Sequence, residues 1–175
     1  NDGQTLSNVR GLAESGWSGV CVEPAPVAYA KLAQLYKNEN TIWTVNAAIT
    51  TQDGPIDFWD CGVHLHKNDT SLLSTTRPET IARWKRSGEQ FTKTTVRGMT
   101  FATLLKETGV NHFDFISIDC EGADLDILAQ IDLAAVGCRM LCVETNGNNQ
   151  PFIDLAAKGG MKAYRRVVEN MIFVR

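Results

Sequence analysis

The sequence contains no apolar run that approaches the roughly 20 residues needed to span a bilayer. It also lacks a basic excess, since 17 Lys and Arg residues stand against 20 Asp and Glu residues for a net charge of −3. Proteins dedicated to nucleic acids usually carry a clear basic excess. We therefore expect a small-molecule substrate, with no nucleic acid and no membrane as partner. The sequence leaves the oligomeric state open.

The cysteines follow no metal-binding or redox pattern. None of the five cysteines belongs to a Cys-x-x-Cys pair, and Cys21 and Cys142 lie inside apolar runs. Cysteines of this kind behave as small apolar core residues in a reducing compartment. We expect free thiols in a cytoplasmic protein, with neither a disulfide nor a zinc site.

Internal repeats and low-complexity tracts are absent, and helix-period segments alternate with short apolar runs. That alternation is typical of a parallel sheet with helices on both faces. We predict an α/β fold with a doubly wound, mostly parallel, Rossmann-like sheet, formed by residues 1–175 as a single domain. Residues 60–91 are polar and irregular in pattern, and we expect an insertion there that could act as a lid.

Several elements have clear local signals. Apolar runs predict strands over 19–23, 113–119 and 140–144, and the β-branched run 41–49 predicts one further strand. Helices are predicted from Leu6 to Gly16, from Pro26, and after the capping residue Thr100. Residues 164–168 and 171–174 flank a turn and predict a terminal hairpin, which a purely parallel nucleotide-binding sheet would not have.

Three carboxylates, Glu23, Asp119 and Glu144, each come directly after a predicted strand or end it. In open α/β sheets, ligands bind beyond the carboxyl ends of the strands, so these acids are expected to converge on one crevice. The alternative is that each acid only caps the helix that follows it. Three such acids in one chain favour the crevice.

Glu23 has the most specific expected role. It lies 20 residues after Gly3, and an acid at about that distance from a glycine-containing first turn binds the ribose hydroxyls in such folds. This spacing does not distinguish a nicotinamide cofactor from S-adenosylmethionine, because both contain an adenosine ribose.

The chain resembles the FkbM-type family of S-adenosylmethionine-dependent methyltransferases. The resemblance is carried by Asn1-Asp2-Gly3, by the segment 16–24, and above all by Asp119-Cys120-Glu121-Gly122 after its apolar strand, which matches the family's Asp-x-Glu-Gly motif. It spans nearly the whole chain and implies the class I methyltransferase fold, whose last strand is antiparallel. It also implies that a strand and a first glycine precede Asn1, so that the N-terminal strand is missing here.

The resemblance further implies roles for individual residues. Asp2 and Gly3 would lie near the methionine part of the cofactor, Glu23 at the ribose, and Asn46 with Ala47 at the adenine. The full set of implied cofactor-binding residues is Asp2, Gly3, Ser7, Glu23, Pro24, Asn46, Ala47 and Asp119. Asp119 and Glu121 would face the transferred methyl group or the substrate.

Methyl transfer from a sulfonium to an alcohol gains from precise positioning and from a base that removes the hydroxyl proton. We expect that base, the catalytic residue, to be Asp119 or Glu121, because the end of a strand holds them rigidly. His64 and His66 are alternatives on a long loop; they, Ser71 and Glu144 are the expected substrate-binding residues. A less favoured alternative is that Asp119, Glu121 and Glu144 hold a divalent metal such as Mg²⁺.

Two other functions remain open at this point. A nucleotide-binding oxidoreductase of Rossmann type would share Glu23 and the crevice, but not the Asp-x-Glu-Gly motif or the terminal hairpin. A non-catalytic scaffold could have kept the fold after losing cofactor binding. The expected function is O-methylation of a hydroxyl on a sugar or another small metabolite, with S-adenosylmethionine as cofactor.

Overall fold

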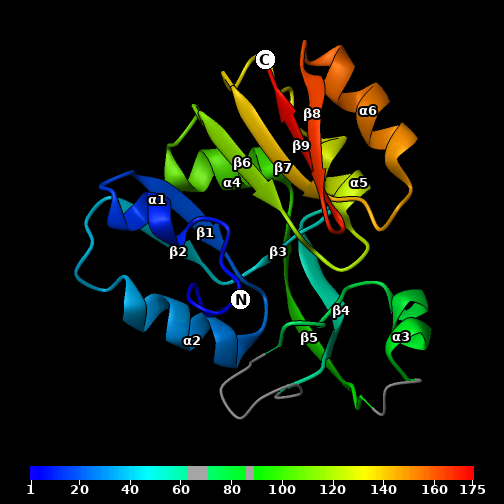
Figure 1. Ribbon diagram of the computed structural model, residues 1–175. Helices are drawn as coiled ribbons and strands as arrows, with labels where there is room; N and C mark the ends of the chain where they lie inside the picture. The colour runs from blue at the N-terminus through cyan, green and yellow to red at the C-terminus, as the bar shows by residue number, and fades with distance from the viewer. Residues whose placement is uncertain (63–70, 86–88) are drawn as a thin grey trace. The chain divides into compact units, whose positions relative to one another are not determined.

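The computed structural model describes residues 1–62, 71–85 and 89–175 (Figure 1). Its elements, in chain order, are α1 (Arg10–Glu14), β1 (Gly19–Val22), α2 (Pro26–Leu35), β2 (Ile42–Val45), β3 (Ala48–Ile49), β4 (Gly54–Asp60), α3 (Pro78–Lys85), β5 (Thr92–Met99), α4 (Phe101–Thr108), β6 (Phe115–Ile118), α5 (Asp124–Leu128), β7 (Met140–Glu144), α6 (Asn149–Lys158), β8 (Lys162–Val167) and β9 (Asn170–Val174). Within these ranges no helix has the length and apolar character needed to cross a membrane.

The mixed α/β class predicted from the sequence is confirmed, in two compact units, Asn1–Met99 and Thr100–Arg175. The strands form three separate hydrogen-bonded sheets, β1-β2, β3-β5-β4 and β6-β7-β9-β8, where we expected one doubly wound sheet. The single-domain organisation over 1–175 stays a prediction. The described part of the expected insertion 60–91 includes the helix α3.

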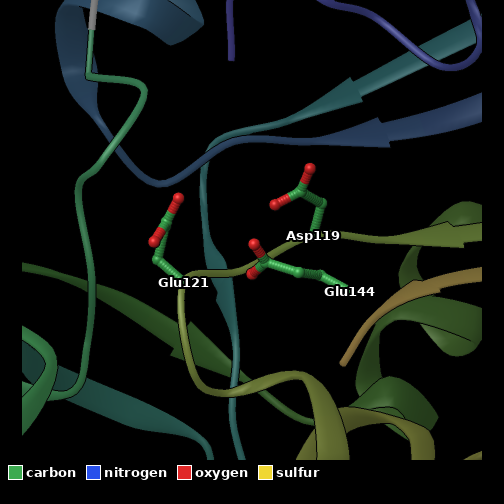
Figure 2. Close-up of side chains that lie close together, drawn as sticks. All are labelled: Asp119, Glu121 and Glu144. Atoms are coloured by element: carbon green, nitrogen blue, oxygen red, sulfur yellow. The ribbon is translucent and has the colours of Figure 1, made fainter. Parts of the chain in front are cut away.

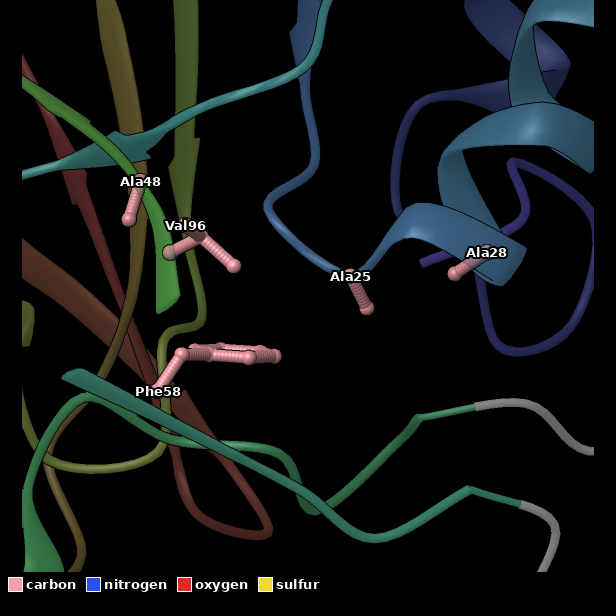
Figure 3. Packing of buried hydrophobic residues seen from close by; sticks show 5 residues of the cluster. All are labelled: Ala25, Ala28, Ala48, Phe58 and Val96. Carbon is pink, nitrogen blue, oxygen red and sulfur yellow. The ribbon is translucent and has the colours of Figure 1, made fainter. Parts of the chain in front are cut away.

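Unit 1 (Asn1–Met99) combines the parallel pair β1-β2 with the sheet β3-β5-β4. A small apolar core joins the start of α2 to that second sheet: its buried members are Ala25, Ala28, Ala48, Phe58 and Val96 (Figure 3). The helix α2 begins at Pro26, as predicted, because a proline at the first helical position needs no N–H partner. Ala25 directly precedes the helix and Ala28 lies on its buried side, and both are completely buried in this core.

Two expected elements of unit 1 are shorter than predicted. The run 41–49 is divided into β2 and β3, which belong to different sheets. The predicted helix from Leu6 is limited to α1, since Leu6 has a positive φ of 52° and is exposed. In the preceding turn, the Asp2 carboxylate accepts hydrogen bonds from the amides of Gln4 and Thr5, both at 2.9 Å. Local side-chain to backbone bonding of this kind competes with helix formation.

Unit 2 (Thr100–Arg175) is built on the sheet β6-β7-β9-β8. β6 and β7 are parallel, whereas β9 runs antiparallel to both β7 and β8. The predicted terminal hairpin and the antiparallel last strand are therefore confirmed. Helix α4 begins after Thr100, whose side chain accepts a hydrogen bond from the Thr103 amide, as the capping pattern predicted.

Gly98 lies on the central strand β5, where it pairs with Ala48 on one side and Gly54 on the other. A Cβ atom there would stand 2.9 Å from the Gly54 carbonyl oxygen and 2.9 Å from a methyl group of Ile56. We expect Gly98→Ala to lower the free energy of unfolding by about 1–3 kcal/mol, because the sheet must shift to admit the methyl group. Chemical denaturation followed by circular dichroism measures this.

The control is Gly11→Ala in the exposed helix α1, where a Cβ atom would meet no other atom within 4 Å. This substitution should raise the free energy of unfolding by up to about 1 kcal/mol, since alanine loses less backbone entropy in a helix. Equal effects of the two substitutions would contradict the close approach at Gly98.

Candidate functional site

Three acidic side chains of unit 2 converge beyond the ends of neighbouring parallel strands. Asp119 follows β6 and Glu144 ends β7; the preceding residues, Ile118 and Val143, are direct partners in the β6-β7 ladder. Glu121 lies in the turn after Asp119. Each residue offers one carboxylate oxygen, and these oxygens lie within 4.8 Å of one another (Figure 2). The structure thus brings together three of the predicted site residues, which we call the acidic cluster.

The turn that carries Glu121 is fixed by a residue that the sequence analysis missed. The buried carboxylate of Asp124 accepts hydrogen bonds from the amides of Cys120 (2.8 Å) and Gly122 (3.0 Å). Glu121 adopts a positive φ of 49°, which is uncommon for a residue with a side chain. Backbone conformations of this kind cluster at functional sites. An acid at the start of a short helix, Asp124 in α5, was the available signal.

Glu144 is the most deeply buried member of the acidic cluster, with 6% of its surface exposed. One carboxylate oxygen, Oε2, is buried and has no hydrogen-bond partner among the described residues. Burial, together with the charges of Glu121, Asp119 and Asp124, raises the pKa of Glu144 to about 8, against a weaker opposing effect of a hydrogen bond with Asn146. Glu144 therefore holds its proton near neutral pH in the metal-free protein.

The other two members differ in their access to solvent. Asp119 is exposed and Glu121 is half-buried. Although the residue is exposed, surrounding protein atoms partly desolvate the Asp119 carboxyl and raise its pKa, and the charge of Glu169 adds to the effect. Burial likewise raises the pKa of Asp124, although its two amide hydrogen bonds oppose the shift. The acidic cluster thus has one buried end, at Glu144, and one end open to solvent.

Glu23 and its neighbours form a second group of predicted residues, in unit 1. Glu23 follows β1, is 6% exposed, and accepts a hydrogen bond from the Ala25 amide through Oε1 at 2.7 Å. Its other oxygen, Oε2, accepts from the backbone nitrogen of Asn1. The Asn46 side-chain amide donates to the backbone carbonyls of Glu23 (2.8 Å) and Pro24 (3.2 Å). The structure therefore brings Glu23, Pro24 and Asn46 together.

Asp2 and Gly3 stand in a tight turn at the start of unit 1. Gly3 has φ of +78°, and a Cβ atom there would be 2.7 Å from a Leu32 methyl group, so both the conformation and the space require glycine. Burial raises the pKa of Asp2, but hydrogen bonds from Thr5 and Gln4 outweigh burial and lower it. The Ser7 hydroxyl accepts from the Arg10 amide at 3.2 Å and supports the start of α1.

The remaining predicted residues are Ala47, which directly follows Asn46 in the chain, and Ser71, His64 and His66. Ala47 is completely buried. Ser71 is buried with a positive φ of 58°, and its hydroxyl donates to the Asp60 carboxylate at 2.7 Å. Asp60, which the sequence analysis missed, also accepts from Ser74 at 2.9 Å. His64 and His66 lie outside the described residues.

Comparison with known proteins identifies the family. A family model described as the methyltransferase FkbM domain matches residues 1–171 of the 175-residue chain. The chain belongs to this family. No curated protein and no solved structure matches it at the significance threshold applied. Membership confirms the resemblance inferred from the Asp-x-Glu-Gly motif, and it supports a methyltransferase.

Because the folded protein raises the pKa of Glu144, Glu144 contributes fully to stability only below its ordinary pKa of 4.5. That contribution is lost as the pH rises through about 8, where the buried carboxyl must ionise beside Asp119, Glu121 and Asp124. In chelator-treated protein, we expect Glu144→Gln to gain roughly 1–3 kcal/mol in free energy of unfolding, relative to the unsubstituted protein, between pH 5 and pH 9. Urea denaturation at each pH measures the difference.

The matched control is Glu107→Gln on the exposed surface of α4 in the same unit, which should keep a constant difference over this pH range. A Glu144→Gln difference that is equally independent of pH would contradict the raised pKa.

Proposed function

We propose that the protein is an S-adenosylmethionine-dependent O-methyltransferase that acts on a hydroxyl group of a sugar or another small metabolite. The match of the FkbM methyltransferase family over residues 1–171 carries this proposal. The proposal includes the doubly wound class I methyltransferase sheet, and the order β6-β7-β9-β8 with an antiparallel β9 supports it.

The residues of unit 1 fit the adenosine part of such a cofactor. Glu23 is a buried carboxylate directly after a parallel strand, and a carboxylate can accept hydrogen bonds from both hydroxyls of a ribose. The Asn46 amide holds the adjoining backbone of Glu23 and Pro24 in place. We therefore assign ribose binding to Glu23 and assign Asn46 the positioning of the Glu23–Pro24 backbone.

The same cofactor assignment covers the turn at Asp2 and Gly3. The Leu32, Leu35 and Tyr36 side chains pack against Gly3 so closely that a Cβ atom would collide with them, and its φ of +78° also favours glycine. The two Asp2 oxygens are engaged by Gln4 and Thr5 within the turn. We assign Asp2 the role of shaping this turn, next to the methionine part of the cofactor.

S-adenosylmethionine supplies a methyl group on a positively charged sulfur. In its transfer to an alcohol, a carbon–oxygen bond forms as the sulfur–carbon bond breaks, and the hydroxyl proton must pass to a base. We assign the acceptor to the acidic cluster, where the solvent-accessible Asp119 and Glu121 can accept that proton. Glu144, which keeps its own proton near neutral pH, is the poorer base and a better hydrogen-bond partner for an acceptor oxygen.

The decisive test is binding of S-adenosylhomocysteine, the product form of the cofactor, measured by isothermal titration calorimetry. We expect the unsubstituted protein to bind it, and Glu23→Gln to bind it at least tenfold more weakly, a loss of about 1.4 kcal/mol. The loss follows because an amide oxygen is a weaker acceptor for ribose hydroxyls than a carboxylate.

Glu39→Gln, which alters an exposed acid of the same unit, is the matched control and should bind as the unsubstituted protein does. A thermal-shift comparison with NAD accompanies the titration. Stabilisation by NAD alone would indicate an oxidoreductase, and the absence of binding to either compound would indicate a protein that uses the fold without the cofactor.

A further inference from the structure

The acidic cluster places one carboxylate oxygen from each of three residues within 4.8 Å of the others. We propose that Asp119, Glu121 and Glu144 form a binding site for a divalent cation of the Mg²⁺ type. Binding of the cation does not depend on the proposed function, whereas its use in methyl transfer rests on it.

The first observation is the convergence of the ligand atoms. One carboxylate oxygen from each of the three residues lies within 4.8 Å of the others, and Figure 2 shows the carboxylates directed toward a common space. Around an octahedral Mg²⁺ with ligand distances of about 2.0–2.1 Å, oxygens stand about 3 Å or about 4 Å apart. Because the observed separations extend to 4.8 Å, the carboxylates would move closer together around the ion.

The second observation is independent of that spacing. Glu144 is 94% buried, and its Oε2 has no hydrogen-bond partner among the described residues. The residue directly opposite it in the β7-β9 ladder is Asn170, whose Oδ1 is also buried and has no partner in the described part of the chain. Directly opposed residues project from the same face of a sheet. Two neighbouring buried oxygens therefore lack a donor, although buried polar atoms in native proteins are nearly always satisfied.

A proton on Glu144 does not neutralise the other two carboxylates of the acidic cluster. A protonated Glu144 carboxyl can donate one hydrogen bond to a neighbouring oxygen, but Asp119 and Glu121 then remain charged beside each other. A divalent cation displaces the Glu144 proton to solvent, takes a Glu144 oxygen as a ligand and lowers the repulsion among all three carboxylates at once. Asp124, whose oxygens accept from the Cys120 and Gly122 amides, holds the Glu121 turn in place without needing the ion.

The chemistry of the donors selects the ion. All three ligands are carboxylates, and oxygen-only sites favour Mg²⁺ and Mn²⁺ over ions that prefer sulfur or imidazole. Mg²⁺ also keeps several waters and is commonly held by a few protein carboxylates. The exposed position of Asp119 leaves one side of the site accessible to water or to an acceptor oxygen.

If the proposed methyl transfer is correct, the ion places positive charge beside the acceptor hydroxyl and favours loss of its proton. Asp119 and Glu121 would then act as ligands, and the proton would pass to solvent. A cation site explains why three carboxyl groups lie together in the acidic cluster, whereas a single catalytic base would require only one.

The test is direct cation binding by protein that has been treated with chelator and contains no cofactor. Mn²⁺ binding is followed by the loss of the free-ion electron paramagnetic resonance signal, with Mg²⁺ as competitor, and thermal unfolding is recorded with MgCl₂ or with NaCl at equal ionic strength. We expect one Mn²⁺ site that Mg²⁺ displaces, and a higher unfolding midpoint with MgCl₂ than with NaCl. Glu144→Gln and Asp119→Asn should each weaken Mn²⁺ binding at least tenfold.

Glu107→Gln on α4 and Asp154→Asn on α6 are the matched controls and should bind Mn²⁺ unchanged. Urea denaturation of the chelator-treated Glu144→Gln variant shows separately that this variant folds. Equal stabilisation by NaCl and MgCl₂, or equal Mn²⁺ binding by Glu144→Gln and Glu107→Gln, would overturn the proposal and leave a proton-sharing acid cluster. S-adenosylhomocysteine binding without added metal separates this outcome from failure of the proposed function.

Discussion

The parallel pairing of β6 with β7 is the constraint on which the acidic cluster depends. Because Ile118 pairs with Val143, the residues that follow them, Asp119 and Glu144, leave the sheet at the same edge. The pairing of β7 with β9 fixes Glu144 opposite Asn170. Two ladders thus hold the Glu144 carboxyl in a buried position, where its charge is costly and its protonation favoured.

The turn after β6 adds the third acid at the cost of an unfavourable backbone conformation. Glu121 takes a positive φ, and the Asp124 carboxylate satisfies the amides on both sides of it. Both carboxylate oxygens of Asp124 accept hydrogen bonds from this turn, although burial raises the pKa of Asp124. A sequence under selection for stability alone would avoid such crowding, and violations of local rules are expected at functional sites. The geometry of this turn therefore favours a chemical role for these acids over the alternative that each one only caps a helix.

Local signals predicted the elements that depend on near neighbours. Pro26 and Thr100 start α2 and α4, and the terminal hairpin follows from two short runs around a turn. The division of the run 41–49 could not be predicted in this way. Its strand propensity is continuous, but the Asn46 side chain bonds to the Glu23 and Pro24 carbonyls, more than 20 residues away in the sequence. A distant partner overrides propensity there, as tertiary contacts commonly do.

The position of the candidate site was also predictable from local sequence signals, whereas the distant contacts within it were not. Its position follows from acids at strand ends, and the Asp-x-Glu-Gly motif identified the family, because both features are contiguous in the sequence. The partners that decide the chemistry are not contiguous. Asn170 reaches Glu144 only through the β7-β9 register, and only the packed structure shows that Glu144 Oε2 has no partner among the described residues. From the sequence alone, metal binding was a less favoured alternative to base catalysis. The buried Glu144 and Asn170 oxygens, which have no donor among the described residues, favour the proposed cation site, since a metal ligand is best provided by a fixed, desolvated oxygen.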